Sequence, residues 1–269
     1  MYKLIAIDLD GTLLNDEHEI TPEVQSAVLE ARAKGIKIVL CSGRPIGGIL
    51  RFVEELGLNQ EDDYVVSFNG AYILNTYTNE PVQKLSLGYE DLKRLYQLSI
   101  DLDASMQYFD LEKIYTLNKD IHRHTVFDSY LTQVSLHYRT LEEIPKDVRL
   151  QKVMFVDEPD RIIEIIHNIP TYLKELYMMQ RSAPFFYEFV HPNATKGKAI
   201  QFLAKRLGIQ RSEVMCIGDQ GNDVTMIQFA GCGVAMENAI PELKKIANFQ
   251  TLSNNSNGVA HAIREFVLK

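Results

Sequence analysis

The chain has 269 residues, 46% of them hydrophobic, which suffices for one large domain or two unequal ones. Its formal net charge of -8 and the lack of a local basic patch argue against a general affinity for nucleic acid or anionic membranes. No apolar stretch is long enough to cross a membrane, and Asp8 comes too early for a signal peptide, so we expect a cytoplasmic protein.

The first third of the chain alternates strand-like and helix-like segments. A short apolar run at 4–7 is typical of a strand buried on both faces, and a helix follows from Pro22 until the chain reaches Gly35. A second buried strand at 36–41, a helix at 46–56 and a third strand at 64–71 continue the alternation. This order and spacing predict βαβ units and a parallel sheet.

The same alternation returns near the C-terminus. Helical periodicity at 198–207 is followed by a strand at 213–218, a short helix at 224–229 and a strand at 232–236. The segment 258–266 is predicted to add a last helix. The two ends of the chain therefore predict one α/β core with a parallel sheet.

The middle of the chain has a different pattern, in which paired strands follow a helix. We predict helices at 91–100, 120–131 and 159–168, and strands at 105–108, 113–117, 133–138, 151–157, 176–180 and 185–190. This pattern favours an antiparallel sheet with helices on one face, an α+β module inserted into the core. The predicted domains are a catalytic core of residues 1–84 and 191–269 and an insert of residues 85–190.

Polar residues follow the predicted core strands at the point where each strand ends. Asp8 and Asp10 follow the first strand, Ser42 follows the second, and Asp219 and Asp223 follow the strand at 213–218. Ligands of open parallel sheets bind at this edge, so the four carboxylates converge if the strands are neighbours. Carboxylates in close proximity raise one another's pKa or need a cation. With oxygen donors alone, Mg²⁺ is favoured over zinc.

Glycines beside these acids indicate which kind of ligand the metal would help to bind. Gly11, Gly43 and Gly218 allow backbone N–H groups to approach an anion closely, which suits a phosphoryl group. Asp8 is then placed to attack phosphorus and form an aspartyl-phosphate. Asp10 is placed to protonate the leaving oxygen and later to deprotonate the attacking water.

Phosphoryl transfer also needs donors and positive charge around the phosphoryl oxygens. The Ser42 hydroxyl, the N–H groups of Leu9 and Gly43, and one lysine are candidates for this phosphate-binding role. Lys196 and Lys198 both lie in the right region of the sequence. We favour Lys196, because it stands at the predicted entrance of a helix while Lys198 lies farther into it.

Four motifs in this order resemble those of the haloacid dehalogenase superfamily of phosphatases: DLDGT from Asp8, SGR from Ser42, KG from Lys196 and GDQGND from Gly218. With FNGA around Asn69, GVAMENA and the central insert, the whole chain is similar to the Cof-type subfamily and its bacterial YidA-type sugar phosphatases. The resemblance implies a Rossmann-like core, a mobile α+β cap, and a Mg²⁺-dependent phosphomonoesterase acting on small phosphorylated metabolites.

The resemblance also implies roles for the motif residues. Asp8 would be nucleophile and metal ligand, and Asp10 the acid/base, with its backbone carbonyl also on the metal. Asp219 would be a further metal ligand, and Asp223 would bind the metal through water or orient its neighbours. Ser42 and Asn222 would hold the phosphoryl group, and Lys196 would bridge it to Asp8.

Simpler interpretations of these residues exist. Asp8 and Asp10 could lie in a solvated turn, Ser42 could cap the helix that follows it, Lys196 could be a surface lysine, and Asp223 could cap the helix at 224–229.

Two other functions use similar residues. A phospho-aspartate receiver stores the phosphoryl group as a switch, although it needs no large insert. A phosphomutase hands the group to a sugar. Oligomeric state and substrate identity stay open.

Overall fold

The computed structural model describes residues 2–269, and the chain divides into two compact units. Among the described residues, the first unit contains residues 2–43, 49–84 and 195–269, and the second contains residues 44–48 and 85–194. Each unit is built on its own β-sheet. Within residues 2–269, no helix combines the length and the apolar character that crossing a membrane requires.

The first unit contains an eight-stranded sheet in the order β14-β13-β12-β1-β2-β3-β4-β5. Its strands are β1 (Leu4–Asp8), β2 (Lys37–Cys41), β3 (Tyr64–Ser67), β4 (Tyr72–Asn75), β5 (Glu80–Lys84), β12 (Val214–Gly218), β13 (Cys232–Ala235) and β14 (Phe249–Gln250). The six strands from β14 to β3 are parallel. Every residue of β1 and β12 is buried, as expected for central parallel strands that are covered on both faces.

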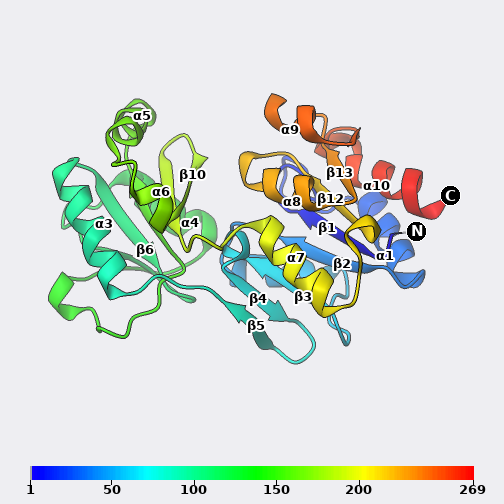
Figure 1. The fold of residues 1–269 in the computed structure, drawn as a ribbon, viewed down its shortest axis with the longest axis horizontal. Coiled ribbons are helices and arrows are strands. Elements are labelled where there is room, and N and C mark those ends of the chain that lie inside the picture. The colour runs from blue at the N-terminus through cyan, green and yellow to red at the C-terminus, as the bar shows by residue number, and fades with distance from the viewer. Residues whose placement is uncertain (1) are drawn as a thin grey trace. The chain divides into compact units, whose positions relative to one another are not determined.

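Strand order reverses at β1, which lies between β12 and β2 (Figure 1). From β1 the chain passes through α1 (Pro22–Ala33) to β2 on one side, whereas from β12 it passes through α8 (Val224–Phe229) to β13 on the other. Because such crossovers are right-handed, α1 and α8 cover opposite faces of the sheet. The carboxyl ends of β1 and β12 therefore meet at a switch point, where α/β folds bind their ligands.

The other helices of this unit extend the two helical layers. Helix α10 packs against α1, and α7 packs against α8. Their bounds, with those of the two helices that follow β2 and β13, are α10 (Gly258–Ile263), α7 (Lys196–Arg206), α2 (Gly47–Glu55) and α9 (Pro241–Ile246). Helix α7 begins two residues earlier than the periodicity predicted, because the Thr195 hydroxyl accepts a hydrogen bond from the N–H of Lys198 and caps the helix.

The third strand, predicted at 64–71, is shorter in the structure. It ends at Ser67, because Phe68 and Asn69 both have left-handed backbone conformations, with φ of 49° and 55°. A short 3₁₀ turn, η1 (Phe68–Gly70), follows. The chain then turns back through the antiparallel hairpin of β4 and β5, which is cyan in Figure 1 and was not predicted.

The second unit contains a six-stranded sheet in the order β10-β11-β9-β6-β7-β8. Its elements are α3 (Tyr89–Asp101), β6 (Ser105–Phe109), β7 (Ile114–Thr116), α4 (Arg123–Thr132), β8 (Leu136–Tyr138), β9 (Lys152–Val156), α5 (Pro159–Asn168), α6 (Leu173–Leu176), β10 (Met178–Ala183) and β11 (Phe186–Val190). Its strands pair antiparallel except for β7 and β8, which are parallel. The prediction of a wholly antiparallel sheet was wrong at this pair, because α4 forms a crossover between the two strands.

The helices of the second unit do not share one face of its sheet. Met106 and Tyr108 of β6 belong to the apolar core that also contains residues of α3 and α5. Between them, Gln107 points to the opposite face, since side chains alternate along a strand. There its Nε2 donates a hydrogen bond of 2.6 Å to Oδ2 of Asp128 in α4. Helix α4 thus covers the face opposite to α3 and α5, contrary to the prediction of helices on one face.

Candidate active site

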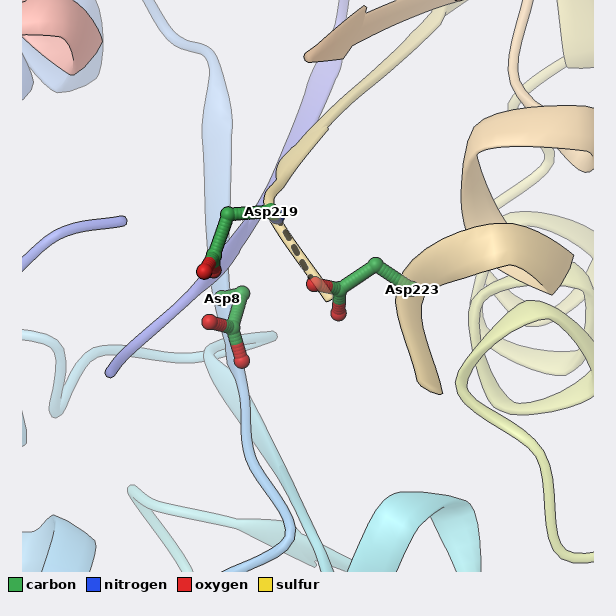
Figure 2. Close-up of side chains that lie close together, drawn as sticks. All are labelled: Asp8, Asp219 and Asp223. Carbon is green, nitrogen blue, oxygen red and sulfur yellow. Dashed lines mark hydrogen bonds between the residues drawn. The ribbon is translucent and has the colours of Figure 1, made fainter. Parts of the chain in front are cut away.

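Three buried aspartates from separate segments gather at the switch point of the first unit. Asp8 is the last residue of β1, Asp219 directly follows β12, and Asp223 ends the 3₁₀ turn η4 (Gly221–Asp223). Each offers a carboxylate oxygen, and these oxygens lie within 4.8 Å of one another. Figure 2 shows the three side chains close together. The convergence expected from the strand order is therefore present for these three acids.

The loop after β12 holds two of these carboxylates in place. Oδ2 of Asp223 accepts hydrogen bonds from the backbone N–H groups of Asp219, at 2.9 Å, and Gln220, at 3.0 Å (Figure 2 draws the first). The side chain of Asp219 accepts one from the Thr12 hydroxyl, at 2.8 Å, and one from Gln220 Nε2, at 3.1 Å. Asp223 therefore orders the loop that carries Asp219. It makes no side-chain cap to α8, the simpler role considered for it.

Lys196 supplies positive charge to the same cluster. It is the first residue of α7 and its side chain is fully buried. Its Nζ donates hydrogen bonds to Oδ1 of Asp8 and to Oδ1 of Asp223, the second at 2.6 Å. Lys198 is exposed on the same helix. Of the two lysines considered from the sequence, the structure brings Lys196 to the carboxylates.

The buried charges shift one another's pKa values. Burial raises the pKa of Asp8 well above its usual range, and Asp223 raises it further. Burial, and then Asp223, raise the pKa of Asp219 to about 6. Burial alone would lower the pKa of Lys196, but Asp223 and Asp8 outweigh it and raise that pKa. One lysine does not balance three carboxylates, so the cluster favours an additional positive charge.

The donor set fits a hard divalent cation. The cluster offers only carboxylate oxygens, it is buried, and its acids repel one another in the absence of a further cation. Mg²⁺ prefers such oxygen ligands, whereas zinc sites usually contain His or Cys. The structure thus has residues able to hold Mg²⁺ at this position.

Asp10 lies outside this cluster. Its side chain is 48% exposed, and Oδ1 lies 3.8 Å from Nδ1 of His18. Its backbone forms an isolated bridge with Leu14 in the turn after β1. The sequence predicted an acid/base group here, and the family resemblance implied that its backbone carbonyl binds the metal. An exposed carboxyl close to the buried Asp8 is compatible with the acid/base role.

The residues predicted to bind phosphate line the same end of the sheet. Ser42 is buried and follows β2, while the helix after it begins only at Gly47, so Ser42 is not its N-cap. Leu9 is buried directly after Asp8. Asn222 Nδ2 donates a hydrogen bond of 3.0 Å to Oδ1 of Asn69.

Several supporting residues were missed in the sequence. Thr12 lies inside the DLDGT motif, yet its hydroxyl was given no role, and Gln220 was likewise passed over inside GDQGND. Asn238, whose Nδ2 donates to the carbonyl of Gly11 at 2.8 Å, steadies the loop after Asp10. All three residues lie inside sequence motifs, Asn238 within GVAMENA, but the contacts of Thr12 and Asn238 join segments 207 and 227 positions apart, which the sequence alone does not reveal.

Comparison with known proteins connects this geometry to a family. The family model described as haloacid dehalogenase-like hydrolase matches residues 5–263. "Putative phosphatase YxeH" of Bacillus subtilis is 59% identical over 100% of this chain and 99% of its own length. The 5-amino-6-(5-phospho-D-ribitylamino)uracil phosphatase YcsE of Bacillus subtilis is 30% identical, covering 99% of this chain and 96% of its own. The solved structure of the HAD subclass IIB sugar phosphatase BT4131 superposes with a TM-score of 0.83 at 25% identity, over 99% of this chain and 100% of that one.

Proposed function

We propose, since this chain belongs to the haloacid dehalogenase-like hydrolase family, that it is a Mg²⁺-dependent phosphomonoesterase for sugar phosphates and related small metabolites. Phosphatase activity itself follows from the family and from the named relatives, and the chain is a phosphatase. The observation that supports a Mg²⁺-dependent reaction at Asp8 is the burial of this residue beside Lys196 and two further carboxylates. A solvated turn would need none of these contacts.

In the proposed reaction, an Oδ atom of Asp8 attacks the phosphorus of the ester. A bond forms between this oxygen and phosphorus, the bond to the ester oxygen breaks, and Asp10 gives that oxygen a proton. In the second step Asp10 takes a proton from water, which attacks the phosphorus and releases inorganic phosphate and the Asp8 carboxylate. Lys196 favours the ionised form of Asp8 that the first step requires.

Asp8, Asp219 and the backbone carbonyl of Asp10 would hold Mg²⁺. The ion would supply positive charge that offsets the charge of the phosphoryl oxygens. Both oxygens of Asp223 already accept hydrogen bonds, from Lys196 and from the loop after β12. These bonds favour an indirect role for Asp223, through a bridging water or through the orientation of Asp219, over direct coordination.

Backbone and side-chain donors would bind the transferring phosphoryl group. We assign this role to the N–H groups of Leu9 and Gly43, the hydroxyl of Ser42, the amide of Asn222 and the ammonium of Lys196. Catalysis of phosphoryl transfer depends mainly on positioning and on charge stabilisation, so a rigid ring of donors is the main requirement.

The substrate proposal is a phosphate ester of a polyhydroxylated carbon chain. One relative is named for a sugar-phosphatase activity, and another for a substrate that carries a phosphorylated ribityl group. These two substrate classes share a phosphate ester on a carbon chain bearing hydroxyl groups. We also propose that residues 85–190 form the substrate-selecting insert, and 1–84 with 191–269 the catalytic core.

The test is a screen of phosphate esters read as kcat/KM. The panel would contain sugar phosphates, a ribityl phosphate, nucleoside monophosphates and an aryl phosphate, each with Mg²⁺ and with a chelator. We expect the polyol esters to give the highest values, with all activity dependent on Mg²⁺. The highest kcat/KM on nucleotides would reject the substrate class, and activity that survives chelation would reject the metal.

The same assay separates a phosphatase from a phosphomutase. A phosphatase releases free phosphate equal to the ester consumed, whereas a mutase returns an isomer that keeps its phosphate. We expect stoichiometric release, because the relatives are phosphatases. A product that retains its phosphate would make the mutase the better interpretation.

A further inference from the structure

Asn69 occupies a strained turn within the first unit. The turn η1 follows β3, and both Phe68 and Asn69 adopt left-handed backbone conformations although neither is glycine. Asn69 is nearly fully buried, at 4% exposure. Consecutive non-glycine residues in this conformation persist only where the surroundings hold them, and such sites often serve a function.

The contacts of Asn69 connect two segments that have a proposed role in phosphate binding. Its backbone N–H donates to the carbonyl of Ser42 at 3.0 Å, and its side-chain Oδ1 accepts from Nδ2 of Asn222, also at 3.0 Å. Its carboxamide lies so close to Gly43 that a Cβ there would be 3.1 Å from both Nδ2 and Oδ1. One buried side chain therefore touches the Ser42-Gly43 segment and Asn222 together.

We infer that Asn69 is a positioning residue for phosphoryl transfer, which fixes the spacing between the Ser42-Gly43 segment and the amide of Asn222. The inference rests on the proposed phosphate-binding role of these residues. The bond from Asn222 Nδ2 to Asn69 restricts rotation of the Asn222 amide. Since small displacements of positioning groups slow an enzyme by about 10²-fold, this restriction has a measurable consequence.

A purely structural explanation must be distinguished from this inference. Asparagine adopts the left-handed conformation more readily than most residues, so Asn69 could serve the turn alone. The substitution Asn69→Gly separates the two roles, because glycine adopts this backbone conformation without strain but lacks the carboxamide. A role in the turn alone predicts normal kinetics for this variant, whereas a positioning role predicts slower turnover.

The experiment is a double-mutant cycle of Asn69→Gly and Asn222→Ala, assayed with 4-nitrophenyl phosphate and Mg²⁺. We expect each single variant to lower kcat/KM by about 10- to 100-fold, and the double variant to lose little more than the worse single one. The inhibition constant of orthovanadate should rise in parallel, while the thermal melting curve stays near that of the parent. Normal kinetics of Asn69→Gly, or fully multiplicative losses in the double variant, would overturn the inference.

A second variant covers the case in which Asn69→Gly folds poorly. Asn69→Asp keeps the shape and an acceptor for Asn222 but adds a negative charge beside Gly43. We expect KM and the inhibition constant of inorganic phosphate to rise at least about 10-fold, because the charge repels the phosphate. Unchanged phosphate binding in Asn69→Asp would contradict the inference.

The cycle also distinguishes the proposed phosphate role of Asn222 from the positioning role of Asn69. If Asn222→Ala has normal kinetics, the phosphate role of Asn222 and the inference both fall, while the nucleophile assigned to Asp8 is tested separately. If Asn222→Ala is slow and Asn69→Gly is normal, the inference alone fails.

Discussion

The carboxylate of Asp8 is buried between Lys196 and two other acids, and it is the group we expect to attack phosphorus. Asp8→Asn should lower kcat by more than about 10³-fold, because an amide cannot replace the nucleophile. The fold should survive, since the change removes one charge from a mutually repelling cluster. Steady-state kinetics measure the loss of kcat, and circular dichroism checks that the fold is retained. Turnover near the parent value, in a preparation free of contaminating enzyme, would reject the covalent mechanism.

Thr12 tests how far a neutral neighbour tunes a proposed metal ligand, Asp219. Its hydroxyl donates to Asp219 and opposes the rise of that pKa, which burial and then Asp223 carry to about 6. Thr12→Val should raise the pKa of Asp219 further, leave it more protonated near neutral pH, and weaken Mg²⁺ activation by about 10-fold. The activation constant is read from rate against Mg²⁺ concentration. Thr12→Ser keeps the hydroxyl and is the matched control, which should stay near the parent.

In the second unit, the buried Asp128 carboxylate is expected to oppose folding at neutral pH. Burial raises its pKa, with Lys152 and Gln107 acting in the other direction. For an acid with a raised folded pKa, stability is lost as pH rises through that pKa. Asp128→Asn removes the charge. Its amide can also donate to Oε1 of Gln107, which finds no hydrogen-bond partner among residues 2–269.

We therefore expect Asp128→Asn to raise the free energy of unfolding at pH 7 by about 1 kcal/mol, and to gain less at pH 5. Urea denaturation at the two pH values measures this. The contrasting variant is Glu188→Gln, which takes away the 2.8 Å ion pair of buried Lys152 and should destabilise by about 3 kcal/mol. Equal destabilisation by both variants would show that Asp128 is a needed counter-ion to Lys152.

At the scale of elements, helix α7 must approach α8 closely enough to bring Lys196 to the acids. Gly197 permits this approach, because a Cβ there would lie 2.3 Å from the carbonyl oxygen of Thr225 in α8. Gly197→Ala should destabilise by about 1–3 kcal/mol and slow turnover, since the helices must separate and move the neighbouring lysine. Gly47→Ala, where a Cβ meets nothing within 4 Å, is the control for chemical denaturation and kinetics. Equal stability of both variants would contradict the packing argument.

The elements that sequence periodicity predicted well are those whose own residues determine them. Buried apolar runs and amphipathic helices, such as β12 and α5, appear close to the predicted positions, and the short helix α8 does too. The third strand was overextended, because the run YVVSFNGA is apolar throughout while its end is set by the left-handed Phe68 and Asn69. The Asn-Gly pair was the available turn signal. The side of the sheet that α4 covers is shown by the contact of Asp128 with Gln107, a tertiary contact without a periodic signature.

The candidate site was predictable to the extent that strand ends bring acids together. Asp8, Asp219 and Asp223 converge because the order of parallel strands places them there, and Lys196 joins them because α7 packs against α8. The supporting hydrogen bonds could not be predicted from the sequence. Asn69 and Asn222 lie 153 positions apart, and no local pattern around either residue indicates that they are bonded.

For the whole molecule, the acid cluster connects stability to both pH and Mg²⁺. Without metal, the raised pKa values of Asp8 and Asp219 mean that the protein loses stability as pH rises through them. A bound divalent ion reverses this penalty, and binding to the folded state alone adds RT ln(1 + [Mg²⁺]/Kd). The increase in melting temperature on adding Mg²⁺ should therefore be larger at pH 8 than at pH 5.

Melting curves with Mg²⁺ and with a chelator, at several pH values, measure this increase. The chelated protein should stay folded at room temperature although inactive, because its apolar strands do not depend on the ion. Asp219→Asn is the control: it removes a proposed metal ligand and should make the melting temperature less sensitive to Mg²⁺ and to pH. A Mg²⁺ effect that is independent of pH, or one that Asp219→Asn retains in full, would place the ion somewhere other than this cluster. The reason is that protons and metal compete for the cluster's carboxylates, whose pKa values are raised.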